Sequence, residues 1–273
     1  MFTKILGANV EIQARSPLIW NTLYQKLGID SHMFRKNELG EGLGDEIIRF
    51  IKDEDYRAIL LAAPLKELAV EHLSEMGYGP NFNLKSINLI YKVRNDIHCV
   101  STDGFGALAS LGLESGKNEF IIFGFGGTSK SIINAIEREN IAHHLTIVTR
   151  QSSNLVNWKL PHKYISYKAI SEDLSKADVL INATSLGNSK DANRSPLSES
   201  EFKKVRHGAR LLDVNYTKTG ATTYLEYGRR LGLKGIDGSL MNLMQALFAF
   251  KLAHPNVSQT IEELGNLENW ENV

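Results

Sequence analysis

The sequence predicts an α/β protein built on a doubly wound, parallel sheet. Short apolar runs typical of buried strands alternate with segments in which apolar residues recur three and four apart, as on one face of a helix. In addition, residues 119–138 place an apolar run, a group of glycines and a helical pattern in direct succession. Strands that alternate with helices favour a parallel sheet, because each helix returns the chain to start the next strand in the same direction.

The first part of the chain, up to residue 101, alternates strand-like and helix-like segments. A helix is predicted from Ser16 to Gly28, because serine is a typical N-cap, Pro17 a typical first helical residue and glycine a typical C-terminal stop. The other predicted elements are a strand beginning at residue 4, a helix at 45–52, a strand at 58–63, a helix at 65–73, and strands at 86–93 and 97–101 that form a hairpin.

A second series of alternating elements follows a helix predicted at residues 103–111, with Asp103 at its N-cap. This series carries the doubly wound sheet, and a long polar loop at residues 185–200 interrupts it. Its predicted strands lie at 120–123, 144–148, 178–183, 210–214 and 233–236, and its later helices at 222–231 and 240–252.

The composition excludes several classes of protein. Hydrophobic residues make up 42% of the chain and charged residues 23%, and 31 basic residues balance 31 acidic ones, so neither nucleic acid nor an anionic membrane is an expected partner. Cys99 is the single cysteine, which excludes an intrachain disulfide and favours a reducing compartment. The first residues lack the apolar core of a signal peptide, no stretch is apolar enough to span a membrane, and the histidines show no metal-binding spacing. We therefore expect a cytoplasmic protein without a metal.

The glycine cluster predicts a phosphate-binding turn. Gly124, Gly126 and Gly127 follow the apolar run directly, and Thr128 and Ser129 open the helical pattern. Ser129 stands where a third glycine of G-x-G-x-x-G would be and is small enough for close packing of helix and strand. Such a corner turns tightly and presents free N–H groups to a pyrophosphate. The alternative is a tight turn without a ligand, but the strand-to-helix context favours a bound dinucleotide.

The end of the next strand indicates which dinucleotide. NAD-specific folds place an acidic residue there, where it binds the ribose 2′-hydroxyl. This chain has Thr149 and Arg150 instead, with Ser152 and Ser153 close behind. A guanidinium beside hydroxyl groups suits a 2′-phosphate, so NADP is the predicted cofactor, with a solvated loop arginine as the alternative.

Several short stretches, in order along almost the whole chain, together resemble motifs of the shikimate dehydrogenase family. Each is weak alone, but the combination is specific. The stretches are Ala14-Arg15-Ser16-Pro17 for the family's Ser-x-Ser-Pro, Ala62-Ala63-Pro64-Leu65-Lys66 for Thr-x-Pro-Phe-Lys, Asn88 for the asparagine of Gly-Ala-x-Asn-Thr, Ser101-Thr102-Asp103-Gly104 for Asn-Thr-Asp-Gly, residues 124–129 for the glycine turn, Asn182-Ala183-Thr184 for Asn-Ala-Thr, and Asp237-Gly238 with Met241 and Gln245 for the final helix.

The resemblance implies two domains with an active site in the cleft between them: an α/β substrate domain at residues 1–103 plus 238–273, and a Rossmann-type NADP domain at 104–237. It implies reversible hydride transfer between NADP and C3 of a cyclic hydroxy acid, a step of aromatic amino acid biosynthesis. Lys66 and Asp103 match the family's catalytic pair. An alcohol that loses a hydride must also lose a proton, so a base or a positioned cation is needed beside its oxygen. Without the resemblance, a solvated lysine and a helix cap would be the simpler interpretations.

The resemblance also assigns the remaining site residues. The matches for substrate binding are Ser16, Asn88, Tyr216 and Gln245. Those for the cofactor are Gly124, Gly126, Gly127, Thr128, Ser129, Asn182, Ala183, Thr184 and Gly238, in addition to Thr149 and Arg150 from the strand end. Structural alternatives stay open: an N-cap for Ser16, a strand-end amide for Asn88, a polar residue of a core helix for Gln245, packing for Tyr216, and a strand-end turn for residues 182–184.

Four departures from the family motifs concern the substrate pocket. Ala14 and Ala62 replace a serine and a threonine, Leu89 replaces the threonine after the asparagine, and Ser101 replaces an asparagine. Each lost hydrogen bond to a charged carboxylate costs about 1.5–3 kcal/mol. We therefore expect a shikimate dehydrogenase-like paralogue that uses shikimate less efficiently than a standard member. The alternatives are a quinate- or aminoshikimate-type dehydrogenase and a non-catalytic NADP-binding regulatory module, and a homodimer is compatible with each.

Overall fold

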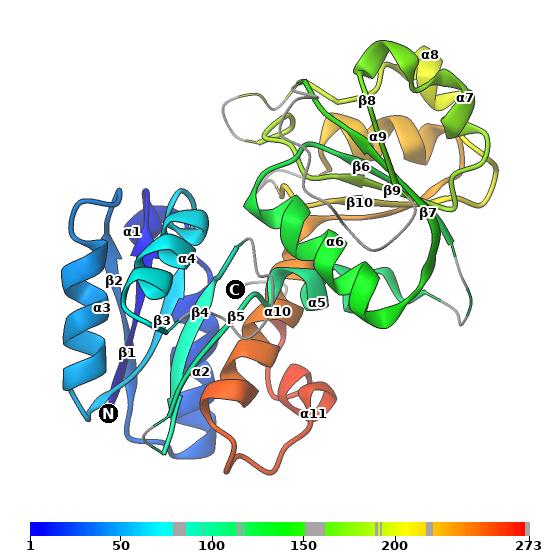
Figure 1. Cartoon of the computed structure of the whole chain (residues 1–273). Helices are drawn as coiled ribbons and strands as arrows, with labels where there is room; N and C mark the ends of the chain where they lie inside the picture. Colours follow the sequence, from blue (N-terminus) through cyan, green and yellow to red (C-terminus); the bar gives the residue numbers. More distant parts are fainter. Residues whose placement is uncertain are drawn as a thin grey trace. The chain divides into compact units, whose positions relative to one another are not determined.

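The computed structural model of the protein describes residues 1–78, 86–94, 96–113, 116, 118–150, 162–188, 191, 193–216 and 221–270. The chain forms two compact units, Met1–Gly106 with Asn242–Val273 and Ala107–Met241, each with its own sheet (Figure 1). The boundaries fall inside α5 (Asp103–Leu111) and α10 (Gly238–Ala253), a few residues beyond the predicted ones. The predicted α/β fold class with two sheets is confirmed.

The first unit contains a mixed five-stranded sheet in the order β2-β1-β3-β4-β5. β1, β2 and β3 are parallel, while β4 pairs antiparallel with both β3 and β5, so the predicted hairpin is confirmed. The strands are β1 (Phe2–Gly7), β2 (His32–Asn37), β3 (Tyr56–Leu61), β4 (Leu89–Val93) and β5 (Asp96–Val100), and the helices are α1 (Val10–Gln13), α2 (Ser16–Leu27), α3 (Leu43–Lys52), α4 (Leu65–Glu75) and α11 (Ile261–Gly265).

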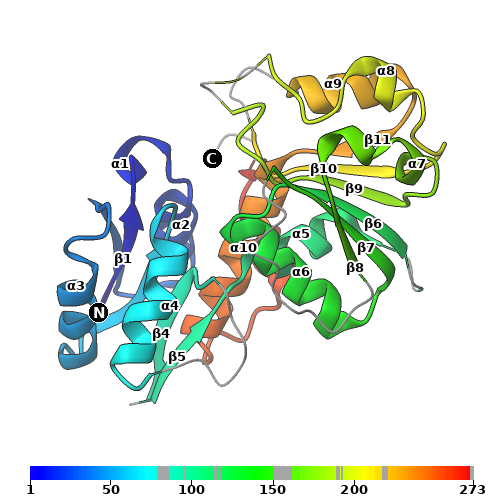
Figure 2. The same cartoon turned by 45° about the horizontal axis from the view of Figure 1, so that its top comes forward.

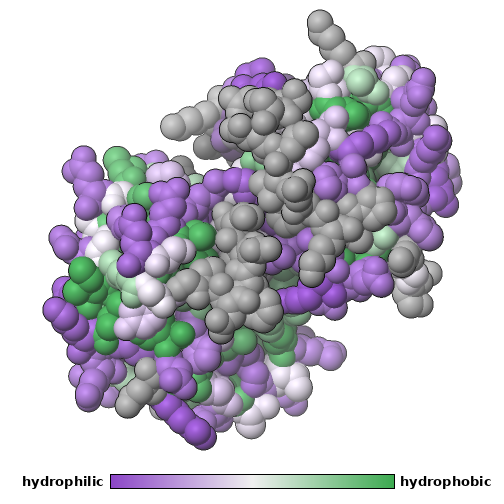
Figure 3. Space-filling model, in the orientation of Figure 1, coloured by the Kyte–Doolittle hydropathy of each residue, from purple (hydrophilic) through white to green (hydrophobic). Residues whose placement is uncertain are grey.

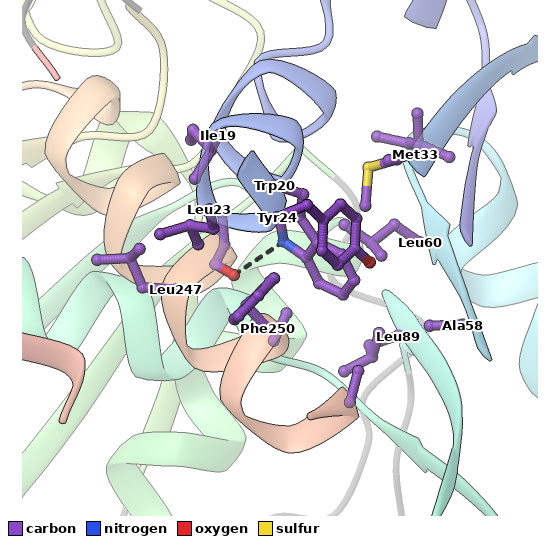
Figure 4. Packing of buried hydrophobic residues seen from close by; sticks show 14 of the residues in the cluster. Ile19, Trp20, Leu23, Tyr24, Met33, Ala58, Leu60, Leu89, Leu247 and Phe250 are labelled. Atoms are coloured by element: carbon purple, nitrogen blue, oxygen red, sulfur yellow. Dashed lines mark hydrogen bonds between the residues drawn. The ribbon is translucent and has the colours of Figure 1, made fainter. Parts of the chain in front are cut away.

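Helices α2 and α10 pack together over one face of this sheet through aromatic side chains. Trp20 of α2 is fully buried, and its indole lies edge-on to Phe250 of α10 with ring centroids 5.2 Å apart. Its Nε1 donates a hydrogen bond to the Ala246 carbonyl at 3.0 Å, drawn as the dashed line in Figure 4. This contact satisfies the one polar atom of the indole inside an apolar cluster. The contact anchors α10, the helix that carries Gln245, to α2 of the first unit.

The prediction of Ser16 as an N-cap is wrong. Helix α2 begins at Ser16 itself, and Arg15 occupies the N-cap position with helical dihedral angles and no side-chain cap bond. Pro17 is compatible with this start because its fixed φ suits the first turn of a helix, where N–H groups have no intrahelical partner. The Ser16 side chain is therefore buried in the first turn, with 4% of the residue exposed.

The second unit contains six parallel strands in the order β11-β10-β9-β6-β7-β8. If the strands are numbered along the chain with β6 as strand 1, the order read from β8 to β11 is 3-2-1-4-5-6, the arrangement of dinucleotide-binding folds. Its switch point lies between β6 and β9. The strands are β6 (Asn118–Phe123), β7 (Ala142–Val148), β8 (His162–Ile165), β9 (Val179–Asn182), β10 (Arg210–Asp213) and β11 (Lys234–Ile236), and the helices are α6 (Gly127–Glu139), the 3-10 helix Tyr167–Ala169, α7 (Ser171–Leu174), α8 (Glu199–Phe202) and α9 (Thr223–Arg230).

Helices cover both faces of this second sheet. Alternate residues of β6 point to opposite faces: Ile122 packs in the cluster that contains Ile133 of α6, and Phe123 in the cluster that contains Tyr224 of α9. Figures 1 and 2 both show α6 on one face and α9 on the other. Strands buried on both faces explain the continuous apolar run of β6.

One face of the molecule is mainly polar (Figure 3). Hydrophilic residues make up most of the face seen in Figure 3, with smaller hydrophobic areas between them. Within the described ranges, no helix combines the length and the apolar character that crossing a bilayer requires. Charged residues make up 23% of the sequence, and residues of this type are expected on a polar surface.

Glu46 of α3 is a buried carboxylate that joins the three parallel strands of the first unit. It is 5% exposed and accepts hydrogen bonds from Lys4 of β1 at 2.5 Å, Lys36 of β2 at 2.9 Å and the Tyr56 hydroxyl of β3 at 3.0 Å. Burial raises the pKa of Glu46, but the hydrogen bonds from Lys4, Lys36 and Tyr56 outweigh burial and lower the pKa to about 2.

Glu46→Gln is expected to lower the free energy of unfolding at neutral pH by about 3 kcal/mol, because it leaves the largely buried Lys4 ammonium without its carboxylate. The pKa of Glu46 is about 2 in the folded state, which is below its value in the unfolded state. The carboxylate therefore stabilises the fold fully at a pH above the unfolded-state pKa, and this stabilisation is lost as the pH falls toward the folded-state pKa. Urea unfolding at neutral pH and near pH 3 should therefore show a smaller gap between wild type and variant in acid. The exposed Glu71→Gln is the control, and a gap independent of pH would contradict the assignment.

Candidate active site

Lys66 and Asp103 lie together in the first unit. Lys66 stands in the first turn of α4, shortly after β3, and Asp103 begins α5, shortly after β5. The antiparallel β4 brings the end of β5 back beside the end of β3, which places the two residues close in space. Lys66 Nζ donates to Asp103 Oδ2 at 2.5 Å, and the two side chains are 18% and 7% exposed. The carboxylate of Asp103 thus holds the ammonium group of Lys66, while part of the Lys66 side chain stays accessible.

Asn88, which precedes β4, orients the other oxygen of Asp103. Its Nδ2 lies 2.8 Å from Asp103 Oδ1, 3.0 Å from Thr102 Oγ1 and 3.2 Å from Gln245 Oε1. Its Oδ1 accepts from the Thr102 backbone N–H at 2.8 Å, and the Thr102 hydroxyl lies 3.0 Å from Gln245 Oε1. The structure therefore brings together Lys66, Asn88, Asp103 and Gln245 from four separate segments.

The buried Thr102 is a member of this cluster that sequence reasoning did not single out, although it lies inside the motif that resembles Asn-Thr-Asp-Gly. Each oxygen of Asp103 is occupied by a different donor, so the carboxylate cannot turn freely, and Lys66 is held in one position. Such an arrangement can place a proton donor, or a cation, beside one oxygen atom of a bound molecule.

The two alanines that depart from the family motifs lie near the carboxyl ends of the parallel strands. Ala62 follows β3, and its N–H donates to the Leu6 carbonyl of β1 at 2.8 Å. Packing is tight there, because a Cβ built on Gly7, whose φ is +154°, would lie 2.7 Å from Ala62 Cβ. Ala14 is half-buried between α1 and α2. Ligands of α/β sheets commonly bind at this end of the strands.

In the second unit, a cavity of about 900 Å³ lies at the carboxyl ends of the central strands. Six of the residues predicted to bind the cofactor line it: Gly124, Gly126, Thr149, Arg150, Ala183 and Thr184. The lining residues that the sequence did not indicate include Phe125, Tyr167, Asp191 and Arg194. The cavity therefore collects the glycine turn, the end of β7 and the turn after β9, the three places where a dinucleotide is expected at the switch point of such a sheet.

The glycine turn has the shape that a pyrophosphate site requires. Gly124 has a φ of +95°, and a Cβ there would lie 2.8 Å from the Ala183 carbonyl oxygen, so only glycine fits. A Cβ on Gly126 would meet no atom within 4 Å, which leaves space for a ligand over this turn. Gly127 begins α6, so Thr128 also lies in the first turn, where backbone N–H groups attract anions. Ser129 is buried and closes the turn by donating to the Gly124 carbonyl at 2.9 Å.

Arg150 lies on the surface at the end of β7 and lines the cavity. Arg150 is close enough to Tyr167 to affect its pKa. Burial raises the pKa of the Tyr167 hydroxyl, and the positive charge of Arg150 opposes this rise. A second guanidinium, that of Arg194, also lines the cavity and lies 3.5 Å from Asp191. Ser152 and Ser153, also predicted near the cofactor, lie outside the described residues.

Three further predicted residues lie elsewhere in the second unit. Asn182 is fully buried and bonds to the loop that follows it. Gly238 begins α10, where a Cβ would lie 2.2 Å from the Val214 carbonyl oxygen, so close packing alone requires this glycine. Tyr216 is half-buried after β10. Their predicted roles in binding remain predictions.

Comparison with known proteins finds relatives that cover most of the chain. No family model matches the sequence. The curated shikimate dehydrogenase (NADP(+)) of Methanococcus vannielii is 26% identical over 262 residues, with 91% of this chain and 89% of the relative covered. That of Pyrococcus furiosus is 28% identical over 257 residues, with 92% and 90% covered. The sequence is thus similar to shikimate dehydrogenases over almost its whole length.

Solved structures of other proteins show the same fold. Shikimate 5-dehydrogenase of Thermus thermophilus, solved with NADP(H) and shikimate, aligns with a TM-score of 0.79 over 98% of each chain at 22% identity. A 5-ketofructose reductase of Gluconobacter sp. strain CHM43, solved without ligand, aligns with a TM-score of 0.79 over 100% of this chain and 98% of its own, at 19% identity. The fold is thus shared with a protein named for a different substrate.

Proposed function

We propose that this protein belongs to the shikimate dehydrogenase family and is an NADP-dependent oxidoreductase that interconverts shikimate, or a related cyclic hydroxy acid, and its 3-dehydro form. The observation that carries the proposal is the Lys66–Asp103 pair, with its atoms 2.5 Å apart and Asn88 fixing the second carboxylate oxygen. The relatives that support it are named as NADP-dependent enzymes. Such a reaction belongs to aromatic amino acid biosynthesis in the cytoplasm.

The pair supplies the proton half of the reaction. When the hydroxy acid is oxidised, the C3 carbon loses a hydride and the hydroxyl oxygen loses a proton. In this direction the neutral amine of Lys66 would lie beside that oxygen, accept the proton and become an ammonium, which returns the proton to the carbonyl oxygen in the reverse direction. Asp103 keeps Lys66 in place and balances its charge as the proton moves. Bound NADP⁺ would accept the hydride at its nicotinamide ring.

The chemistry of the cavity fits NADP. Backbone N–H groups at the start of α6 suit the pyrophosphate, and Arg150 with Thr149 suits the 2′-phosphate. NADP should therefore bind at least about tenfold more tightly than NAD, and Arg150→Ala should narrow this ratio, because the guanidinium would contact only the phosphate that NAD lacks. Titration of each variant with both cofactors measures the ratio. Arg138→Ala, which removes a guanidinium from the exposed end of α6, is the control. Equal affinities of the wild type for NADP and NAD would contradict the proposal.

The alanines at positions 14 and 62 set the expected substrate range. We expect lower efficiency with shikimate than in a standard family member, and a quinate- or aminoshikimate-type substrate is the first alternative. The fold shared with a 5-ketofructose reductase favours including ketoses among the candidates. A screen of cyclic hydroxy acids and ketoses with NADP and NAD, followed by the absorbance of the reduced cofactor, tests the assignment. Tight NADP binding without turnover of any of these compounds would instead favour a regulatory module.

A further inference from the structure

A buried carboxylate lies beneath one wall of the cofactor cavity. Asp213 is the last residue of β10 and has no exposed surface. Its register partner on β9 is Asn182, so the two side chains stand at the same edge of the sheet. Asp213 Oδ1 accepts from Asn182 Nδ2 and from both Asn215 N and Asn215 Nδ2, each at 3.0 Å. Its Oδ2 accepts from the Thr222 hydroxyl at 2.6 Å.

The two amides that contact Asp213 hold the loop that lines the cavity. Asn182 Oδ1 accepts from Thr184 N at 3.1 Å and from Thr184 Oγ1 at 2.7 Å, and Asn182 Nδ2 donates to the Leu186 carbonyl at 2.9 Å. Asn215 Nδ2 donates to the carbonyls of Thr184 at 2.9 Å and Leu186 at 3.1 Å. Thr184 and Leu186 both line the cavity. The hydrogen-bonding groups of the loop backbone at Thr184 and Leu186 are therefore paired with side chains rather than with a neighbouring strand.

The carboxylate determines which way the two amides point. An ionised carboxylate only accepts hydrogen bonds, so Asn182 and Asn215 must both turn their NH₂ groups toward Asp213. That choice leaves Asn182 Oδ1 facing the Thr184 N–H and leaves the second hydrogens of the NH₂ groups facing the loop carbonyls. A rotated amide would place carbonyl against carbonyl and leave buried groups without partners, at a cost comparable to a lost hydrogen bond for each. Burial raises the pKa of Asp213, and the hydrogen bonds from Thr222, Asn215 and Asn182 oppose that rise.

We propose that Asp213 is the positioning residue of the cofactor site: through Asn182 and Asn215 it sets the conformation of the loop that presents Thr184 and Leu186 to the dinucleotide. The inference rests on the proposed function for the identity of the ligand, but the arrangement of the loop is a property of the chain itself. Asp213 acts through its neighbours and touches neither substrate nor cofactor. Asn182 then serves as a link between Asp213 and the loop.

Two substitutions at Asp213 separate orientation from charge. Asp213→Ala removes the acceptor and should raise the Kd for NADP at least about tenfold, while kcat at saturating NADP changes less than about threefold, because the Lys66 pair lies in the other unit. Asp213→Asn can point its oxygen at Asn182 and Asn215 and its NH₂ at the Thr222 hydroxyl, which can also accept. This variant should therefore keep the Kd within about threefold of wild type.

Hydrogen exchange gives a readout that does not need the cofactor. The Thr184 N–H donates to Asn182 Oδ1 and the Leu186 N–H to the Thr184 hydroxyl, so both should be protected in the wild type. In Asp213→Ala their exchange should speed up about tenfold or more, while amides of β6 stay protected. If Asp213→Ala fails to fold, Asn215→Ala provides the same test, because it removes the bonds to Thr184 and Leu186 from a half-buried position outside the strands.

Two controls identify a merely structural effect. Tyr224→Phe removes a buried hydroxyl near Asp213 that has no hydrogen-bond partner among the described residues, and it should change nothing. Ile136→Val lowers the Tm of the same unit through its core and should leave the Kd for NADP unchanged. The proposal is overturned by unchanged exchange in Asp213→Ala, by an Asn variant as impaired as the Ala variant, or by equal losses of affinity in Asp213→Ala and Ile136→Val. A wild type that fails to bind NADP would refute the proposed function alone, because the exchange experiment still decides the role of Asp213.

Discussion

Lys66→Ala is expected to lower kcat by about 10²- to 10⁴-fold, the usual effect of losing a positioned acid–base group. The reason is geometric: Lys66 Nζ is held by Asp103 at 2.5 Å and is the partly accessible member of the pair. NADP affinity should change little, because the cavity with the glycine turn belongs to the second unit. Steady-state kinetics with the best substrate of the screen, together with direct titration of NADP, measures both quantities.

Two further variants test whether the pair acts as a unit. Asp103→Ala should also impair turnover, and the double variant should be little worse than the worse single one, because residues that act together are not additive. Lys36→Ala is the matched control, since it removes an ammonium that also pairs with a carboxylate in the first unit, far along the sequence from the pair. Retention of more than about a tenth of wild-type turnover by Lys66→Ala would exclude it as the catalytic group.

The sequence predicted the central elements of both sheets because they follow strong local patterns. The run that forms β6 is apolar at every buried position. The first glycine after it, Gly124, adopts a positive φ that favours glycine. Strands β2 and β8, each at an edge of its sheet, were not predicted. β2 buries Met33 but mostly exposes its other side chains, so it shows neither an apolar run nor a clear alternation.

The candidate site was only partly predictable, because much of it depends on contacts between distant segments. Motif resemblance indicated Lys66, Asn88, Asp103 and Gln245, yet the bonds by which Asn88 joins Asp103 to Gln245 link residues up to 157 positions apart. Arg194 comes from a polar loop without a pattern of its own, and only the fold brings it to the cavity. A buried strand-end aspartate such as Asp213 shows its role only when its neighbours on β9 are known.

The double variant Ala14→Ser with Ala62→Thr should raise kcat/KM for shikimate. Each restored hydroxyl can contribute about 1.5–3 kcal/mol if it reaches the charged or hydroxylated groups of the substrate, and the pair about 2–5 kcal/mol, with incomplete additivity because both act on one ligand. The gain should appear mainly in KM, since these groups bind the substrate without entering the proton transfer. Initial rates at varied shikimate and saturating NADP measure it.

The matched control replaces threonine by valine at position 62. Ala14→Ser with Ala62→Val adds the same volume as the double variant at this position but lacks the second hydroxyl. The control is needed because Ala62 lies against Gly7, where a Cβ would approach to 2.7 Å, so a branched side chain must fit beside the ends of β1 and β3. Ala62→Ser, which adds the hydroxyl without the methyl group, shows whether any loss comes from crowding.

The outcome distinguishes two views of the pocket. If the alanines alone separate this chain from an efficient shikimate dehydrogenase, the threonine variant should exceed the valine variant by about the contribution of one hydrogen bond, roughly tenfold in kcat/KM. Leu89 and Ser101 also depart from the family motifs, and Leu89 is fully buried as the first residue of β4. If the pocket is reshaped through these positions as well, both double variants should leave kcat/KM for shikimate unchanged and lower activity on the preferred substrate. An unchanged value would reject the simple view and would direct the search to substrates whose polar groups do not face positions 14 and 62.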